Sequence, residues 1–365
     1  MRKLRVTVLT GGVSSEREIC LMSGRKVLDA LDPARYEVKC LDLAAVSGRR
    51  AVCLMDGGTA WGELQGPRGE WEGDDKAAGL AQLLAPTSAV RPAVGQDSMV
   101  GDGVPDVVFI ALHGGAGENG SVQGMLDVLG IPYTGSGVLA SALAMNKIMA
   151  KKVFERERIP TPEWVAVRVG DPSARERVLE GVGFPCVTKP ACEGSTIGVS
   201  IVKTADELGP ALDIALSYGP DALVERFIAG TEITGPVIGN DDAHVLPLVE
   251  IVPSGGFYDY ERKYKPGATQ EIVPARLPET VAGRARELTL RAHHALGCRG
   301  ISRVDMMAAA EEVFVLEVNT IPGLTETSLV PRAAQAAGIS FPQLVDRLIE
   351  LALEERGGGG DGRGS

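Results

Sequence analysis

Long apolar runs and closely spaced cysteine pairs are both missing from this sequence. No stretch of about 18 apolar residues occurs, so no membrane-spanning helix is expected. The six cysteines form no Cys-x-x-Cys pair, which disfavours a zinc site or a redox centre. The opening segment, MRKLRVTVLT, holds a short apolar run that Arg5 interrupts, and it predicts a β-strand rather than a signal peptide. We therefore expect a cytoplasmic protein with reduced thiols.

The sequence also has no excess of basic residues. The 365-residue chain carries 48 acidic against 37 basic residues, a formal net charge of −11. Such a balance disfavours nucleic acid and anionic membranes as partners, although a few converging Lys and Arg side chains could still bind a small anion. The length exceeds what one compact core usually holds, and it predicts two or three domains.

Glycine, by contrast, is abundant, with 46 residues, about double the usual share. The glycines follow no period of three, which excludes collagen. Those from Gly357 onward predict a flexible tail. Most others lie in loops, where a backbone without Cβ allows a close approach that a larger residue would block.

Strands and helices alternate over the first 135 residues, which predicts an α/β domain with a parallel sheet. The expected strands are 5–9, 36–42, 106–112 and 131–135, and the expected helices begin near residues 16 and 121. The stretch 57–103 is rich in Gly, Pro and Ser, and its weak periodicity predicts an irregular excursion.

The pattern changes after residue 135, where mixed strands and helices predict two further lobes. Strands are expected at 164–168, 185–189, 195–202, 222–227, 232–238 and 244–251, and helices at 138–158, 205–218, 279–296 and 341–355. We expect domains at 1–135, 136–225 and 226–356, followed by a tail at 357–365. No internal repeat is visible.

The strongest chemical signal lies in two segments of the last third, SRVD and LEVN. Side chains alternate between the faces of a strand, so Arg303 and Asp305 share one face, as do Glu317 and Asn319. If the strands pair, these polar groups converge. Two carboxylates and an amide oxygen are ligands that Mg²⁺ prefers, whereas the alternative is a charged hairpin that faces solvent. The opposite face is expected to enter the core through Phe314, Leu316 and Val318.

A glycine-rich loop follows a predicted strand that ends at Lys189. It carries Gly194, Ser195 and Gly198, and glycine lets backbone N–H groups approach phosphate oxygens while a lysine adds positive charge. The loop is no Walker A motif, because G-x-x-x-x-G-K-[ST] is missing and a strand follows. Phosphate binding is one interpretation, and a plain hairpin is the other.

Two more loops follow strands of the first domain, at the crevice where α/β sheets bind ligands. In the first, Ser15 and Glu18 have the spacing of a capping box, and Glu16 could hold an ammonium group. No G-x-G-x-x-G is present, which argues against an NAD-dependent oxidoreductase. In the second, His113 opens the segment HGGAGENG, and its position favours a functional and a structural role about equally.

The segment FYDYERKYKPGATQ, residues 257–270, is a long loop rich in Tyr and Lys. Loops of this length are more often lids than linkers. Lys263 and Tyr264 are then expected to cover bound phosphates and substrate.

Six motifs occur in an order and spacing that resemble the D-alanine–D-alanine ligase family of the ATP-grasp superfamily. They are GGVSSEREICLMSG, HGGAGENGSVQG, KPACEGSTIGVS, YDYERKYKPGATQ, GISRVDMM and LEVNTIPGLTETSLVPRAAQAAGISFPQLV. The resemblance covers nearly the whole chain except residues 44–104 and the tail. It implies an α/β and α+β protein with a three-lobed ATP-grasp fold and an N-terminal parallel-sheet (pre-ATP-grasp) domain. Residues 1–135 are then the substrate domain, 136–225 the central lobe with the phosphate loop, and 226–356 the C-terminal lobe with the lid and the magnesium site.

The resemblance also implies an activity. It indicates an ATP-dependent ligase that joins two D-alanines through an acyl phosphate for bacterial peptidoglycan synthesis, with two Mg²⁺ or Mn²⁺ ions as cofactors. Small molecules are the expected partners, and dimers are common in the family. One alternative is a ligase that takes D-lactate or D-serine second, although Tyr264 resembles the dipeptide formers. The other is a non-catalytic nucleotide-binding protein, against which the intact polar set on the two strands argues.

The family's site residues carry over position by position. For ATP, the resemblance implies phosphate contacts from Lys147, Lys189 and Lys263, adenine contacts from Glu225 and the backbone of Phe227 and Ile228, and a ribose contact from Glu232. For the metal, it implies Asp305, Glu317 and Asn319 as ligands. Arg303 and the backbone N–H of Gly323 would form the oxyanion site.

For the amino acids, the resemblance implies that Glu16 holds the first ammonium group and that His113 lies near the first carboxylate. Ser328 and Leu329 would hold the second carboxylate. A hydrogen-bonded trio would close the lid, formed by Glu16, Ser195 and Tyr264.

Overall fold

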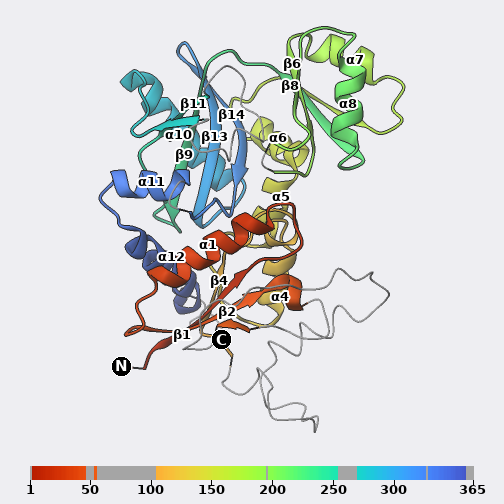
Figure 1. The fold of residues 1–365 in the computed structure, drawn as a ribbon. Coiled ribbons are helices and arrows are strands. Elements are labelled where there is room, and N and C mark those ends of the chain that lie inside the picture. The colour runs from red at the N-terminus through yellow and green to blue at the C-terminus, as the bar shows by residue number, and fades with distance from the viewer. Residues whose placement is uncertain are drawn as a thin grey trace, which may run out of the picture.

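The computed structural model describes residues 2–46, 53–55, 104–194, 196–253, 269–325 and 328–358. Three sheets organise these residues, one in the N-terminal part, one in the middle of the chain and one formed by the last third (Figure 1). The predicted excursion at 57–103 lies outside the described residues. So do most of the predicted lid loop, with Lys263 and Tyr264, and Ser195 of the glycine-rich loop.

The first sheet has the strand order β3-β2-β1-β4. Its strands are β1 (Leu4–Thr10), β2 (Tyr36–Asp42), β3 (Cys53–Met55) and β4 (Val107–Ile110). β1 runs parallel to both β2 and β4, whereas β3 is antiparallel to β2. A short helix, α2 (Leu43–Val46), follows β2. The predicted α/β domain with a parallel sheet is thus confirmed.

Helices cover both faces of this sheet. α1 (Arg17–Ala30) packs on β1 so closely that a Cβ on Gly24 would lie 2.5 Å from Thr10 Oγ1. On the other face, α4 (Ser121–Val128) contributes Val122 and Leu126 to a cluster with Ile110 of β4. A 3₁₀ turn, η1 (Gly115–Gly117), lies between β4 and α4. Both faces of the sheet are therefore shielded from water, as is usual for a parallel sheet.

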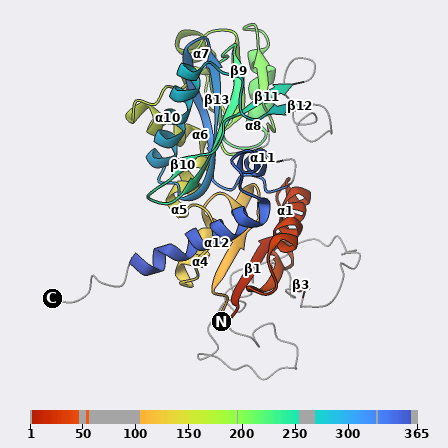
Figure 2. The same cartoon turned by 90° about the vertical axis from the view of Figure 1, so that its left-hand side faces the viewer.

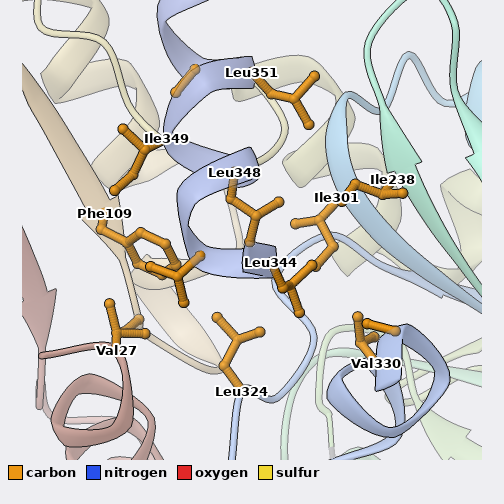
Figure 3. Close-up of a cluster of buried hydrophobic side chains, with 14 of the residues drawn as sticks. Val27, Phe109, Ile238, Ile301, Leu324, Val330, Leu344, Leu348, Ile349 and Leu351 are labelled. Carbon is orange, nitrogen blue, oxygen red and sulfur yellow. The ribbon is translucent and has the colours of Figure 1, made fainter. Parts of the chain in front are cut away.

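The last helix, α12 (Phe341–Gly358), returns to the first domain and lies beside α1 (Figures 1 and 2). Its Leu344 and Leu348 are buried in one cluster with Phe109 of β4, Val27 of α1 and Ile301 from the last third of the chain (Figure 3). Burial of this apolar surface joins the two ends of the sequence. Because the helix includes Gly358, the first two residues of the predicted tail are helical.

The middle sheet is antiparallel and has the order β5-β8-β6-β7. Its strands are β5 (Trp164–Arg168), β6 (Cys186–Pro190), β7 (Ser200–Val202) and β8 (Asp221–Arg226). Two helices pack on it, α7 (Ala174–Gly181) and α8 (Leu208–Leu216). α7 has no counterpart among the predicted helices, because it buries only Ala174 and Val178, an apolar stripe too narrow for periodicity to reveal.

The third sheet is antiparallel, with the order β12-β11-β9-β13-β14 and β10 paired to β9. Its strands are β9 (Thr231–Gly239), β10 (His244–Val245), β11 (Val249–Pro253), β12 (Thr269–Ile272), β13 (Gly300–Ala309) and β14 (Glu312–Asn319). α10 (Glu279–Ala295) packs on this sheet. The single strand expected at 244–251 is therefore two strands, β10 and β11.

The long helix expected at 138–158 is two helices, α5 (Val138–Met145) and α6 (Lys147–Arg156). Asn146 separates them in an extended conformation, and its side-chain oxygen accepts a hydrogen bond from the Met149 N–H at 3.1 Å. Asn is a strong helix N-cap, which explains the break inside a continuous apolar pattern. Both helices share a core with α10 and the third sheet, through Ala144 and Phe154. Across the described residues, no helix is both long and apolar enough to cross a membrane.

Candidate active site

The predicted pairing of the two polar strand segments is confirmed. β13 and β14 are antiparallel, with Arg303 opposite Asn319 and Asp305 opposite Glu317. Arg303 donates two hydrogen bonds to the Asp305 carboxylate, from Nε at 2.8 Å and Nη2 at 2.7 Å. Asn319 Nδ2 donates to the same carboxylate at 2.9 Å, and Thr234 Oγ1 of β9 does so at 2.6 Å. The hairpin thus gathers its carboxylates and amide on one face, with Asp305 at the centre of the network.

The core face of this hairpin differs from the prediction. Val318 is buried as expected, but Phe314 and Leu316 are only half-buried, and Val313 and Val315 enter the core instead. The pairing register shifts after Asp305, so that Leu316 has no opposite residue. This β-bulge inserts one residue and moves all preceding side chains of β14 to the other face.

Lys147, the first residue of α6, connects three parts of the site. Its ammonium group lies 3.1 Å from Glu317 Oε2 and donates to the carbonyl oxygen of Glu193 in the glycine-rich loop at 2.7 Å. Its backbone N–H donates to the Ala191 carbonyl at 2.8 Å. The lysine predicted at the phosphates is therefore held between the candidate metal ligands and the candidate phosphate loop.

Lys189 and Glu225 are both buried and form an ion pair between the adjacent strands β6 and β8. A second lysine, Lys151 of α6, lies 2.7 Å from Glu225 Oε2. Burial alone would raise the pKa of the Glu225 carboxyl, but the two ammonium groups outweigh it and the pKa is lowered. Sequence reasoning missed Lys151, although it lies one helical turn after Lys147 and therefore on the same side of α6.

The remaining residues predicted at the nucleotide follow β8. Phe227 and Ile228 are half-buried, and the Phe227 N–H donates to the Pro185 carbonyl at 3.1 Å. Glu232 lies in β9, also half-buried. The predicted adenine and ribose contacts of these residues stay predictions.

A hollow with an empty volume of about 330 Å³, its open mouth included, lies at the meeting point of these elements. Its lining comes from β14, from the junction of α5 and α6, and from two loops: Glu118, Ala144, Met145, Lys147, Glu193, Gly194, Glu317, Val318, Asn319 and Thr320. The hollow thus brings together one side of the hairpin, the Lys147 ammonium group and the glycine-rich loop.

Glu16 lies where three loops meet. Its carboxylate is so close to the Gly114 backbone that a Cβ on that glycine would lie 2.8 Å from Glu16 Oε2, and a Cβ on Gly194 would lie 3.5 Å from it. Gly114 also has a φ of 68°, which glycine adopts without strain. The predicted capping box is wrong: Glu16 itself is the N-cap of α1, and its side chain makes no capping hydrogen bond to the helix. Ser14 Oγ instead donates to the His113 carbonyl at 2.7 Å.

An ion pair that sequence reasoning missed stabilises the loop that carries Glu16. Arg17 and Asp42 form an ion pair with an N–O distance of 2.6 Å, and the Gly12 N–H donates to Asp42 Oδ1 at 3.0 Å. Burial would raise the pKa of Asp42, but hydrogen bonds from Arg17 and the backbone outweigh it and lower the pKa. These contacts of Asp42 with Arg17 and Gly12 fix the backbone just before α1.

His113 is buried at 5% exposure, and both ring nitrogens have protein partners. Nδ1 lies 3.1 Å from the Ile321 carbonyl oxygen, which can only accept, so this nitrogen carries the proton. Nε2, 2.9 Å from Ser23 Oγ, then accepts from the hydroxyl. Burial lowers the pKa of the ring, so the neutral form is favoured. The ring thus connects Ser23 of the first domain to Ile321 of the loop after β14. The predicted contact of His113 with a substrate carboxylate stays a prediction.

Gly323 and Ser328 belong to the loop that leads from β14 into α11 (Leu329–Ala336). A Cβ on Gly323 would lie 2.8 Å from Ser328 Oγ, so a larger residue here would displace the Ser328 hydroxyl. Ser328 Oγ accepts from the Thr325 N–H at 3.0 Å. Leu329 is the first residue of the helix and its side chain is buried in the core, which leaves its backbone for the predicted contact with the second substrate.

Glu118 lines the hollow, and its carboxyl accepts a hydrogen bond from the Gly114 N–H at 2.8 Å. Burial, and then the nearby Glu16 charge, raise its pKa from the ordinary 4.5 to about 7. The folded protein therefore binds more protons than the unfolded chain between these two values. Its free energy of unfolding should fall as the pH rises through that window.

We expect Glu118→Gln to remove this pH dependence, because the amide keeps an oxygen acceptor for Gly114 but cannot ionise. Relative to the unaltered protein, the variant should gain stability from pH 5 to pH 8, measured as the midpoint of urea unfolding. The matched control is Glu312→Gln, an exposed position on β14. A midpoint difference that stays constant across pH for Glu118→Gln would contradict the raised pKa.

Comparison with known protein families agrees with this geometry. Residues 5–136 match the family described as D-ala D-ala ligase N-terminus, and residues 153–350 match D-ala D-ala ligase C-terminus. The D-alanine–D-alanine ligase of Desulforudis audaxviator is 44% identical over 351 residues, which cover 96% of this chain and 99% of the relative. That of Moorella thermoacetica is 42% identical, with 96% and 100% covered.

Solved structures give the same result. The D-alanine–D-alanine ligase from Bacillus anthracis complexed with ATP has a TM-score of 0.75 and 31% identity, with 98% of this chain and 99% of that chain covered. The VanG D-Ala:D-Ser ligase from Enterococcus faecalis has a TM-score of 0.76 and 26% identity, with 96% and 100% covered. Matches in sequence and in fold thus extend over nearly the whole chain, and this protein belongs to the D-alanine–D-alanine ligase family.

Proposed function

We propose that this protein joins two D-alanines into D-alanyl-D-alanine, with ATP converted to ADP and phosphate through an acyl phosphate of the first D-alanine. One observation carries the proposal. The Asp305, Glu317 and Asn319 side chains, the Arg303 guanidinium and the Lys147 ammonium group converge at one hairpin and its adjoining hollow. We assign the product to peptidoglycan synthesis and the reaction to the cytoplasm, where ATP is available.

We assign each substrate to particular domains of the chain. We assign ATP to the region between the central lobe, residues 136–225, and the C-terminal lobe, residues 226–356. Lys147 and Lys189 support this assignment, since both ammonium groups are buried in ion pairs at this junction. The domain 1–135 supplies Glu16, which is suited to the first ammonium group because its carboxylate lies beside two glycine-rich loops.

A divalent cation fits the residues on β13 and β14. Two carboxylates and an amide oxygen are hard donors, and the register places Asp305 directly opposite Glu317. Asp305, Glu317 and Asn319 would hold Mg²⁺ or Mn²⁺. When bound, the ion supplies positive charge to the phosphate oxygens of ATP.

Charge stabilisation in both chemical steps falls to cationic groups of the chain. The carboxylate of the first D-alanine attacks the γ-phosphate, and the amine of the second then attacks the acyl phosphate, so negative charge accumulates on phosphate and carbonyl oxygens. Arg303 and the backbone N–H of Gly323 are assigned to the carbonyl oxygen. Ser328 and the start of α11 are assigned to the carboxylate of the second D-alanine, and Ser195, Lys263 and Tyr264 to closure over the site.

The proposal is tested by ADP release with ATP, Mg²⁺ and D-alanine. We expect D-alanine-dependent release of ADP and phosphate, with D-alanyl-D-alanine as the product by mass spectrometry. Parallel reactions that add D-serine, D-lactate or L-alanine measure the choice of second substrate, and D-alanine should be preferred. Absence of D-alanine-dependent turnover would refute the proposal, and preferential formation of a mixed product would reassign the second substrate.

A further inference from the structure

Lys151 of α6 is buried with 0% exposure, and neither the hollow nor the predicted site includes it. An ammonium group in such a position is strongly unfavourable unless it is paired. Lys151 has a carboxylate partner, Glu225 Oε2, at 2.7 Å, and its ammonium group also donates to the Thr161 hydroxyl. The Lys151 ammonium group is thus deeply buried beside the region that we assign to ATP, which suggests a functional role for it.

The contacts of Lys151 join two sheets. Glu225 belongs to β8 of the middle sheet, and its other carboxylate oxygen pairs with Lys189 of β6. Thr161 donates to the Val315 carbonyl of β14 in the third sheet at 2.7 Å. Lys151 itself lies on α6, which packs in the core of the third sheet through Ala150 and Phe154. Through Glu225 and Thr161, Lys151 therefore connects the strands that carry Glu225 and Lys189 to β14, the strand that carries the candidate metal ligands Glu317 and Asn319.

Lys151 also balances charge around Lys189. Three carboxylates act on the Lys189 ammonium group, those of Glu225, Glu317 and Glu232. Lys147 pairs with Glu317, whereas Lys151 and Lys189 both pair with Glu225. Removal of Lys151 therefore takes one positive charge away from Glu225, in the region that we assign to the phosphates of ATP. A net negative charge close to phosphate lowers affinity, and in a dry site its effect is large.

We propose that Lys151 is a positioning residue for ATP: it neutralises Glu225, so that the Lys189 ammonium group remains available to the phosphates, and it holds β6 and β8 against β14. The inference rests on the proposed function, because it takes ATP as the ligand. Lys151 contacts neither ATP nor the amino acids in this arrangement, and it acts through Glu225.

The test compares Lys151→Met with Lys152→Met, the adjacent and exposed lysine of the same helix. Binding of a non-hydrolysable ATP analogue, adenylyl imidodiphosphate, is measured by calorimetry in the presence of Mg²⁺ and without D-alanine. We expect the Kd to rise at least about tenfold for Lys151→Met, the loss of one charge-assisted interaction, and to stay within about twofold for Lys152→Met. An unchanged Kd in a folded Lys151→Met protein would overturn the proposal.

Two further measurements separate a charge effect from a general loss of structure. AMP lacks the terminal phosphates, so Lys151→Met should weaken AMP binding far less than it weakens binding of the triphosphate analogue. The double variant Lys151→Met/Glu225→Gln removes one charge of each sign. Because Glu225 is also assigned to the adenine, this variant is judged by the ratio of its Kd values for the analogue and for AMP, in which the adenine contact cancels; the ratio should lie at least about threefold closer to that of the unaltered protein. Equal losses for AMP and the analogue, or a double variant no better than the single one, would overturn the proposal in favour of a purely structural role.

The double variant also covers the case in which Lys151→Met alone fails to fold, since it removes both members of the buried pair. The unaltered protein serves as the reference for the proposed function. If it binds the analogue but shows no D-alanine-dependent ADP release, the proposed function fails while the role of Lys151 in nucleotide binding can still be measured.

Discussion

Replacing Glu317 with glutamine should lower the rate of D-alanine-dependent ADP release at least about a hundredfold, because one charge-stabilising group at the reaction centre is lost. The Glu317 carboxylate lies opposite Asp305 in the strand register and 3.1 Å from the Lys147 ammonium group. Glutamine keeps the size and one oxygen of the side chain but removes the negative charge. The variant should therefore be a poor ligand for Mg²⁺ and should leave Lys147 without this counter-charge.

The measurement is ADP release at saturating ATP and D-alanine, over a series of Mg²⁺ concentrations. The Glu317 side chain is 27% exposed, so the substitution should leave the fold intact, which circular dichroism checks. Glu312→Gln, on the same strand but exposed, is the matched control and should retain full activity. A folded Glu317→Gln protein with a normal rate would remove Glu317 from the metal site.

Replacing Arg303 with methionine should lower kcat by about a hundredfold to a thousandfold. Arg303 donates two parallel hydrogen bonds to Asp305, at 2.8 and 2.7 Å, and its side chain is only 12% exposed. The substitution removes the proposed stabiliser of the carbonyl oxygen and also the group that orients Asp305. An interaction made mainly in the transition state lowers kcat and kcat/KM together, so the KM for ATP should change little.

Two variants sharpen this prediction. Arg303→Lys keeps the charge but lacks the planar fork that matches a carboxylate, so it should recover only part of the lost rate. Arg284→Met removes a partly exposed arginine that pairs with Glu287 on α10, and it should leave turnover unchanged. A fall in ATP affinity with unchanged kcat for Arg303→Met would show that Arg303 serves nucleotide binding and not the chemical step.

Local pattern predicted much of the site. The polar face of β13 and β14 follows from strand alternation, and the chain needs only a short turn to bring the two strands together. The same pattern misplaced Phe314 and Leu316, because the bulge at Leu316 reverses the faces of the strand, and nothing in the local sequence marks it. The break of the long helix at Asn146 was missed for a similar reason, since apolar periodicity continues across it.

Charges that pair over long distances along the chain could not be predicted. Lys151 and Glu225 lie far apart in the sequence, on α6 and β8, and neither has a pattern that indicates burial beside the other. The same holds for Asp42, which braces the loop before α1 through Arg17. For His113 the sequence left a functional and a structural role open, and only the packed structure shows that both ring nitrogens are engaged by Ser23 and Ile321.

By itself, the sequence determined the family and most of the order of strands and helices, and it predicted the chemical type of the site, because these depend on residue identity and on spacing over a few residues. Only the tertiary structure decided which charges are buried, which of them neutralise each other, and which strand face enters the core. Those outcomes depend on how apolar clusters from distant segments, such as α12 with α1 and β4, pack and exclude water. A lysine on a helix surface and a lysine buried against Glu225 look alike in sequence, and desolvation alone makes them different.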